Sequence, residues 1–283
     1  MTVIVPPGIE VGGERVVRVI EGVGEVVFEN YGPGQWLTQR GDPAKTSRRR
    51  YLHDGEEVDA VSSIVGTLDK PALVRWIEDQ ATRGAVQAER MGELAGVPEE
   101  DWMRRVRSLN LGASAKRDEG AERGTVIHDA MRDLAHGKVP NPSLLPETAR
   151  PWMQAAVRMW LEHRPELVAS EQIVCHPELR YAGRFDLLAR VDGVLTLLDY
   201  KTGKGRVFPE AHWQTRLYAM ALACEGVQVE RVAVVGISDD GDFELMDCDV
   251  SEEDARALVR VFRSRKRVAS NMAAKRKAAK AAR

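Results

Sequence analysis

Two short segments in the second half of the chain, residues 183–191 and 194–201, consist mostly of apolar residues with a few polar ones between them. The dipeptide Asp192-Gly193 separates them. Asp-Gly favours a two-residue hairpin turn because glycine accepts a positive φ, and side chains on a strand alternate between two faces. The pattern therefore predicts an antiparallel hairpin whose register can be counted back from the turn.

This register places Asp186 directly opposite Asp199, with Lys201 on the same face. Two carboxylates about 5 Å apart repel by roughly 3 kcal/mol at an effective dielectric near 20. Because leucines and valines surround them, an unpaired charge costs more. Either one carboxylate is protonated or a cation lies between them, and two oxygen ligands suit Mg²⁺ or Mn²⁺.

The remaining pattern predicts an α/β (α+β) fold with a mixed central sheet flanked by helices. We expect a β-rich arm over 1–60, a helical subdomain over 61–118, a core over 119–262 and a basic helix or tail over 263–283. Residues 116–120 are expected to form a link between helices.

Four more residues are candidates for chemistry. His128 lies on a predicted helix, where a lone histidine is usually a surface or core residue. Gln214 and Tyr218 are four apart on another predicted helix and share one face, with helix packing by the tyrosine and a solvated glutamine as the alternative explanation. Glu171 is expected to open a strand over 171–176, either supporting a metal site or facing solvent.

In order, these residues resemble the RecB-like branch of the PD-(D/E)XK nuclease superfamily, which includes phage exonucleases and CRISPR-associated RecB-like exonucleases. The matching elements are Gly124-Thr125-x-x-His128, Gly183-Arg184-Phe185-Asp186, Asp199-Tyr200-Lys201, Thr202-Gly203 and Gln214-x-x-x-Tyr218.

The resemblance implies a role for each of these residues. His128, Asp186 and Asp199 would bind the metal, with the backbone carbonyl of Tyr200 as a further ligand and Glu171 in support. Lys201 would orient the nucleophile and offset negative charge. The other expected residues beside the active site are Gln214 and Tyr218, while Lys204 either contacts phosphate or is exposed.

The implied activity is hydrolysis of DNA phosphodiester bonds with one or two Mg²⁺ or Mn²⁺ ions. We expect an exonuclease acting on linear single- or double-stranded DNA in phage or bacterial recombination or end processing. A single-strand annealing or recombination protein is a candidate partner. Two alternatives stay open: a structure-specific endonuclease, and a non-catalytic DNA-binding or assembly protein that retains the fold.

Composition changes this picture in few respects. The net charge of −2 gives no overall sign of a nucleic-acid partner, yet residues 263–283 hold nine Lys or Arg and no acid. Such a run either binds phosphate or is a solvated helix end.

The three cysteines and the hydropathy pattern set further expectations. Cys175, Cys224 and Cys248 show no metal-type spacing, and three thiols cannot supply the four ligands of the iron–sulfur cluster found in some RecB-like relatives, so we expect no such cluster. With no apolar run of membrane-spanning length and no signal peptide, we expect no membrane association and a location in the cytoplasm, or the host cytoplasm for a phage protein.

Overall fold

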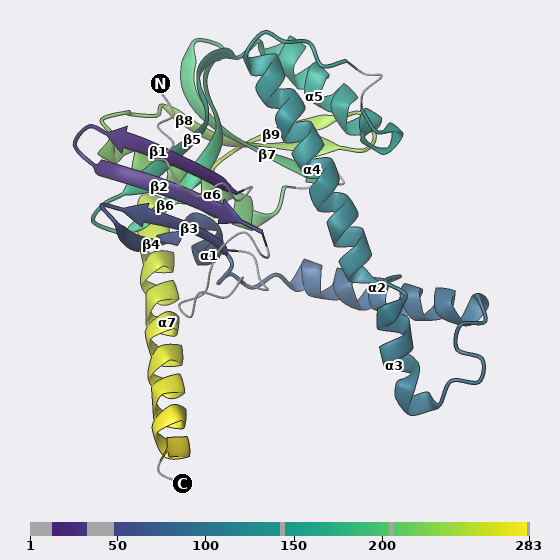
Figure 1. Cartoon of the computed structure of the whole chain (residues 1–283). Helices are drawn as coiled ribbons and strands as arrows, with labels where there is room; N and C mark the ends of the chain where they lie inside the picture. Colours follow the sequence, from purple (N-terminus) through teal and green to yellow (C-terminus); the bar gives the residue numbers. More distant parts are fainter. Residues whose placement is uncertain (1–12, 33–47, 142–144, 204–206, 282–283) are drawn as a thin grey trace.

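A mixed β-sheet runs through the molecule, with helices on both faces (Figure 1). The computed structural model describes residues 13–32, 48–141, 145–203 and 207–281. The predicted class, a mixed sheet flanked by helices, is confirmed. Residues 1–12 and 33–47 of the predicted arm lie outside the described part.

The strands follow the order β1-β2-β3-β4-β6-β7-β8-β9, and β5 also pairs with β6. Their bounds are β1 Glu14–Ile20, β2 Gly24–Tyr31, β3 Arg48–His53, β4 Glu56–Ala60, β5 Glu166–His176, β6 Tyr181–Val191, β7 Val194–Gly203, β8 Arg231–Ser238 and β9 Phe243–Asp247. The helices are α1 Val61–Val65, α2 Pro71–Arg90, α3 Glu99–Ser108, α4 Ala113–Ala135, α5 Arg150–His163, α6 Pro209–Cys224 and α7 Glu252–Ala281, with a 3-10 turn at Glu147–Ala149.

Two apolar layers hold the helices on the sheet. Helices α1, α6 and α7 cover one face through buried residues such as Ile64, Leu217 and Leu258. Helices α4 and α5 cover the other face through Ile127 and Met159. Strands β6 and β7 contribute to both layers because neighbouring side chains on a strand point to opposite faces.

The predicted hairpin is present as β6 and β7. Asp192 and Gly193 have φ values of 51° and 82°, the left-handed conformation that a tight two-residue turn requires. The predicted register is also found: Val191 pairs with Val194, Leu188 with Leu197 and Leu187 with Leu198.

The pairing of β6 with β7 ends one step before the two acids. The last paired residues are Leu187 and Leu198, so the expected cross-strand pair of Asp186 and Asp199 is not formed, and that expectation is wrong. Counted further, the same register would place Arg184 opposite Lys201, and this pair is not formed either.

The cause is a change of partner along β6. Strand β5 pairs with β6 from Tyr181 to Arg190 on one side. On the other side, β4 pairs in parallel with residues 181–182 and β7 with residues 187–191. Residues 183–186, here called the β6 gap, lie between these two partners and leave room for side chains.

A second correction concerns α4, which runs without a break through the expected link at 116–120. Alanine, lysine, arginine and glutamate favour a helix there, and the cost of Gly120, about 1 kcal/mol, is too small to interrupt it. The N-terminal half of α4 lies beside α2, away from the sheet, while its C-terminal half crosses the sheet (Figure 1).

Helix α7 packs through its first turns and then extends away from the sheet (Figure 1). Ala255, Leu258 and Val259 are buried, whereas the side chains of residues 264–281 are exposed. Within the described ranges, no helix combines the length and the apolar character needed to cross a bilayer.

Candidate active site

Asp186 lies at the end of the β6 gap, where its carboxylate accepts a hydrogen bond from the backbone of β7 in place of a backbone carbonyl. Its Oδ2 accepts a 2.7 Å hydrogen bond from the backbone N–H of Tyr200 on β7. Its Oδ1 lies 3.5 Å from Nδ1 of His128, which α4 brings over the sheet. Because the backbone of β7 holds one oxygen, the other is directed at His128.

Asp199 is held from the opposite helix layer. Its carboxylate is almost fully buried, at 1% exposure. Its Oδ1 accepts a 2.9 Å hydrogen bond from Nε2 of Gln214 on α6, and Gln214 also donates to the hydroxyl of Tyr218 at 3.2 Å. Its Oδ2 forms an ion pair with Nζ of Lys201. The pair of residues singled out on α6 therefore contacts the acid of β7.

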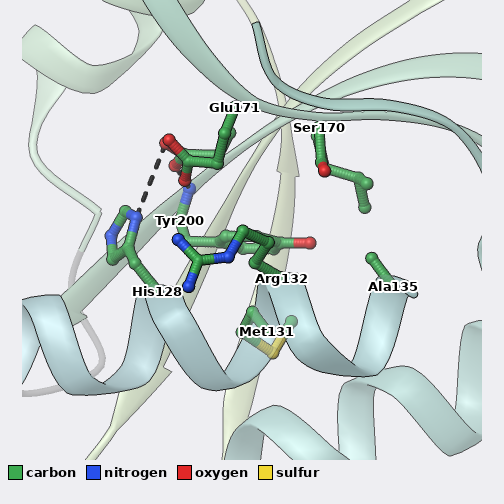
Figure 2. A pocket seen from close by; sticks show the side chains of 9 residues that line it. His128, Met131, Arg132, Ala135, Ser170, Glu171 and Tyr200 are labelled. Carbon is green, nitrogen blue, oxygen red and sulfur yellow. Dashed lines mark hydrogen bonds and ion pairs between the residues drawn. The ribbon is translucent and has the colours of Figure 1, made fainter. Parts of the chain in front are cut away.

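Glu171 lies in the middle of β5, because the strand begins at Glu166 rather than at Glu171 as expected. Its φ of 51° is left-handed, which is rare for a non-glycine residue in a strand. A register shift between Leu167 and Ala169 precedes it. Bulges next to active sites re-aim side chains, and Figure 2 shows the Glu171 carboxylate pointing toward the His128 ring.

His128, Glu171 and Asp186 form a cluster that fits a divalent ion. One ligand atom from each lies within 4.8 Å of the others. Two carboxylate oxygens and an imidazole nitrogen suit Mn²⁺ or Mg²⁺. The described part of the chain contains no other such group of His, Cys, Asp or Glu. Of the expected metal residues, His128, Asp186 and Glu171 are in the cluster, whereas Asp199 is not.

The protonation of the site reflects crowded charges. Although burial opposes ionisation, the His128 ring, the Lys201 ammonium and the Tyr200 amide lower the pKa of Asp186. Burial raises the pKa of Asp199 to about 6, with Lys201 opposing and Asp186 reinforcing the shift. Burial and the Asp186 charge raise the pKa of Glu171 to about 7.

These acids also shift the pKa values of the two basic groups of the site. Burial alone would lower the pKa of His128, yet the Asp186 carboxylate overcomes it and raises that pKa to about 9. Burial likewise opposes the charge of Lys201, but Asp199 and Asp186 raise its pKa.

Several features of the site were not read from the sequence. Helix α4 lies close to the end of β7 at Gly124, where an added Cβ would lie 3.4 Å from Oγ1 of Thr202. Arg132 lines the pocket beside His128 and Glu171 (Figure 2). Trp152 on α5 donates a 2.9 Å hydrogen bond to the carbonyl of Gly203. The left-handed backbone at Glu171 has no sequence signal, and Lys204 lies outside the described residues.

Residues 102–281, more than half of the chain, match the family model of the PD-(D/E)XK nuclease superfamily. The chain belongs to this superfamily. The hairpin acids, the lysine two residues after Asp199 and the flanking helices all lie within the matched range.

Solved structures give weaker similarities. The protein described as SSO0001 is 13% identical, with 71% of each chain covered and a TM-score of 0.34. The alkaline exonuclease LHK-Exo from Laribacter hongkongensis is 18% identical, covering 56% of this chain and 87% of its own, with a TM-score of 0.33. Its complex with dAMP gives the same identity and TM-score over 86% of that chain. No curated protein matches significantly, and the assignment rests on the family model.

Proposed function

We propose that this PD-(D/E)XK superfamily protein is a metal-dependent DNA exonuclease. The observation that carries the proposal is the clustering of His128, Glu171 and Asp186 within 4.8 Å, at a gap bordered by Asp199 and Lys201. A buried group of acids beside an amine is costly unless a cation and an anionic substrate compensate it.

In this proposal, His128, Glu171 and Asp186 hold the ion, with Asp199 and the backbone carbonyl of Tyr200 as further ligands. The ion, Mg²⁺ or Mn²⁺, would supply Lewis-acid stabilisation of negative charge on the phosphate.

The chain's own groups account for the rest of the proposed mechanism. Lys201 orients the attacking water and offsets charge on the phosphate, since its ammonium lies at the gap. Gln214, itself bonded to Tyr218, keeps Asp199 in position through its amide. The Tyr200 amide and His128 do the same for Asp186.

The preference for DNA ends rests on the order of the motifs, which resembles the RecB-like branch. A role in phage or bacterial recombination or end processing, and an annealing or recombination protein as partner, belong to the same proposal.

The substitutions Asp186→Asn and Lys201→Ala test the assignment. Each should lower Mg²⁺- or Mn²⁺-dependent degradation of end-labelled linear DNA by about 100-fold or more, because each removes a charge held at the reacting phosphate. Matched controls are Asp118→Asn on the exposed part of α4 and Lys138→Ala after its end. Circular dichroism verifies that all four variants are folded, and wild-type rates for folded Asp186→Asn or Lys201→Ala would reject the assignment.

Two further measurements separate the alternatives. Degradation of linear but not closed circular DNA would identify an exonuclease, whereas cleavage of circular DNA would identify an endonuclease. If calorimetry detects no Mn²⁺ binding and neither DNA is cleaved, the protein is a non-catalytic member of the superfamily.

A further inference from the structure

Arg123 lies on α4, five residues before His128, and stacks on an aromatic ring. Its guanidinium carbon is 4.1 Å from the centroid of the Trp152 ring. The same indole donates its N–H to the carbonyl of Gly203, at the end of β7. The stacked pair therefore lies beside the segment that follows Lys201.

The guanidinium has no acidic partner among the described residues. No described ion pair includes Arg123, and its buried Nε has no hydrogen-bond acceptor. A half-buried cation without a counter-ion is unfavourable, and an anion would compensate it.

Another arginine of this chain lies over an aromatic ring and also has an acidic partner. Arg158 on α5 lies over the ring of Phe243, at 5.7 Å. Its guanidinium also contacts Asp242, with 3.3 Å between Nη2 and Oδ1. Arg184, 4.6 Å from the centroid of the Phe28 ring, likewise pairs with Glu14. Arg158 and Arg184 thus each have a described carboxylate beside them, whereas Arg123 has none.

The position of Arg123 suits a phosphate group as its ligand. Five residues along a helix correspond to about 7.5 Å of rise, which separates Arg123 from His128 along α4. A Cβ added at Gly124 would lie 3.4 Å from Oγ1 of Thr202, so the intervening surface is the junction of α4 with the end of β7. A planar guanidinium forms paired hydrogen bonds with phosphate oxygens, and stacking fixes its orientation.

We propose that Arg123, oriented by Trp152, binds a backbone phosphate of DNA next to the phosphate that is hydrolysed. This inference rests on the proposed function, because it takes the metal cluster as the site of cleavage. It adds a substrate-binding residue to the helix that carries His128.

The test measures DNA binding without cleavage. In the Lys201→Ala background, the affinity for a fluorescent duplex oligonucleotide is measured by anisotropy over a range of salt concentrations. Adding Arg123→Ala should weaken binding about tenfold, because a charge-assisted contact is lost. It should also reduce the slope of log affinity against log salt by about 0.9, the value for one phosphate contact. Arg158→Ala should change neither quantity.

A second variant separates binding from folding. Arg123→Lys keeps the charge but loses the fork, so it should retain the salt slope while binding more weakly than arginine. Unchanged affinity and slope in folded Arg123→Ala would overturn the inference, as would a loss of stability in both variants without a change in slope. If the wild-type protein does not cleave DNA, the proposed function fails, and the binding series still decides whether Arg123 contacts phosphate.

Discussion

At the residue scale, the site is a set of coupled charges rather than a single acid pair. Asp186 contacts His128 on α4, whereas Asp199 contacts Gln214 on α6. The left-handed backbone of Glu171 costs on the order of 1–3 kcal/mol and persists where the surroundings impose it. In this conformation a carboxylate oxygen of Glu171 lies within 4.8 Å of ligand atoms of His128 and Asp186.

The pH dependence of metal binding follows from these charges. His128 and Glu171, with pKa values of about 9 and about 7, must lose protons before they coordinate an ion. Affinity for Mn²⁺ should therefore rise as pH increases through these two values. Calorimetry in buffers of different ionisation enthalpy should detect proton release at neutral pH that disappears above the higher pKa.

Glu171→Gln should weaken Mn²⁺ binding by about tenfold or more and reduce the number of protons released. Ser170→Ala, which alters a neighbouring residue of the same pocket, is the control. Affinity that does not depend on pH would contradict the coordination by these two residues.

Gly183, in the β6 gap, allows α6 to approach β6. A Cβ at this position would lie 2.4 Å from Cε1 of Tyr218 and 3.1 Å from Cγ2 of Val61. Gly183→Ala should lower the free energy of unfolding by about 1–3 kcal/mol through overpacking. Urea denaturation measures the change, and Gly203→Ala, with nothing within 4 Å of its added carbon, should have a smaller effect.

At the scale of elements, strand β6 organises the site because its two halves pair with different strands. Helix α4 then approaches from one face and α6 from the other, each bringing side chains to the gap. Neither helix alone assembles the chemistry, since His128 and Gln214 act on different acids.

The contribution of α6 can be measured at Gln214. Gln214→Ala leaves Oδ1 of the buried Asp199 without its amide donor, which should cost about 1–3 kcal/mol of stability. The rate of DNA degradation at saturating substrate should fall as well, because Asp199 loses its orientation. Gln228→Ala, on the exposed loop after α6, should change neither quantity. Full activity of Gln214→Ala would show that Lys201 suffices to position Asp199.

At the scale of the whole molecule, polar contacts add to the sheet pairing and apolar packing that join β1–β4 and α7 to the rest of the structure. Arg184 of the β6 gap forms a 2.7 Å ion pair with Glu14 on β1 and lies 4.6 Å from the centroid of the Phe28 ring. Lys266 of α7 reaches Asp59 on β4 at 2.7 Å. The division into an arm, a helical subdomain, a core and a basic end stays a prediction, and its boundary near 118 falls inside α4.

The exposed end of α7 offers a test of its basic side chains. Ending the chain after residue 269 removes Lys275, Arg276, Lys277, Lys280 and Arg283 but no buried side chain of the described residues. The midpoint of thermal unfolding should stay unchanged, while DNA affinity and its salt dependence decrease because phosphate contacts are lost. A lower midpoint would show that this segment supports the fold, and unchanged affinity would show that it is only a solvated helix end.

The sequence alone determined the hairpin and its register, because Asp192-Gly193 specifies the turn and the alternation of residues specifies the faces. It also identified the residues that the structure brings together, since their order resembles a known family. These features depend on neighbours a few positions apart.

Only the tertiary structure decided how the acids are arranged. The β6 gap arises because β4, about 120 residues earlier, pairs with the start of β6, and no local pattern encodes that contact. No local pattern encodes the left-handed backbone of Glu171 either, which lies in a strand whose pairing with β6 shifts register between Leu167 and Ala169. Sequence periodicity describes regular strands, and this site is formed where two strands cease to be regular.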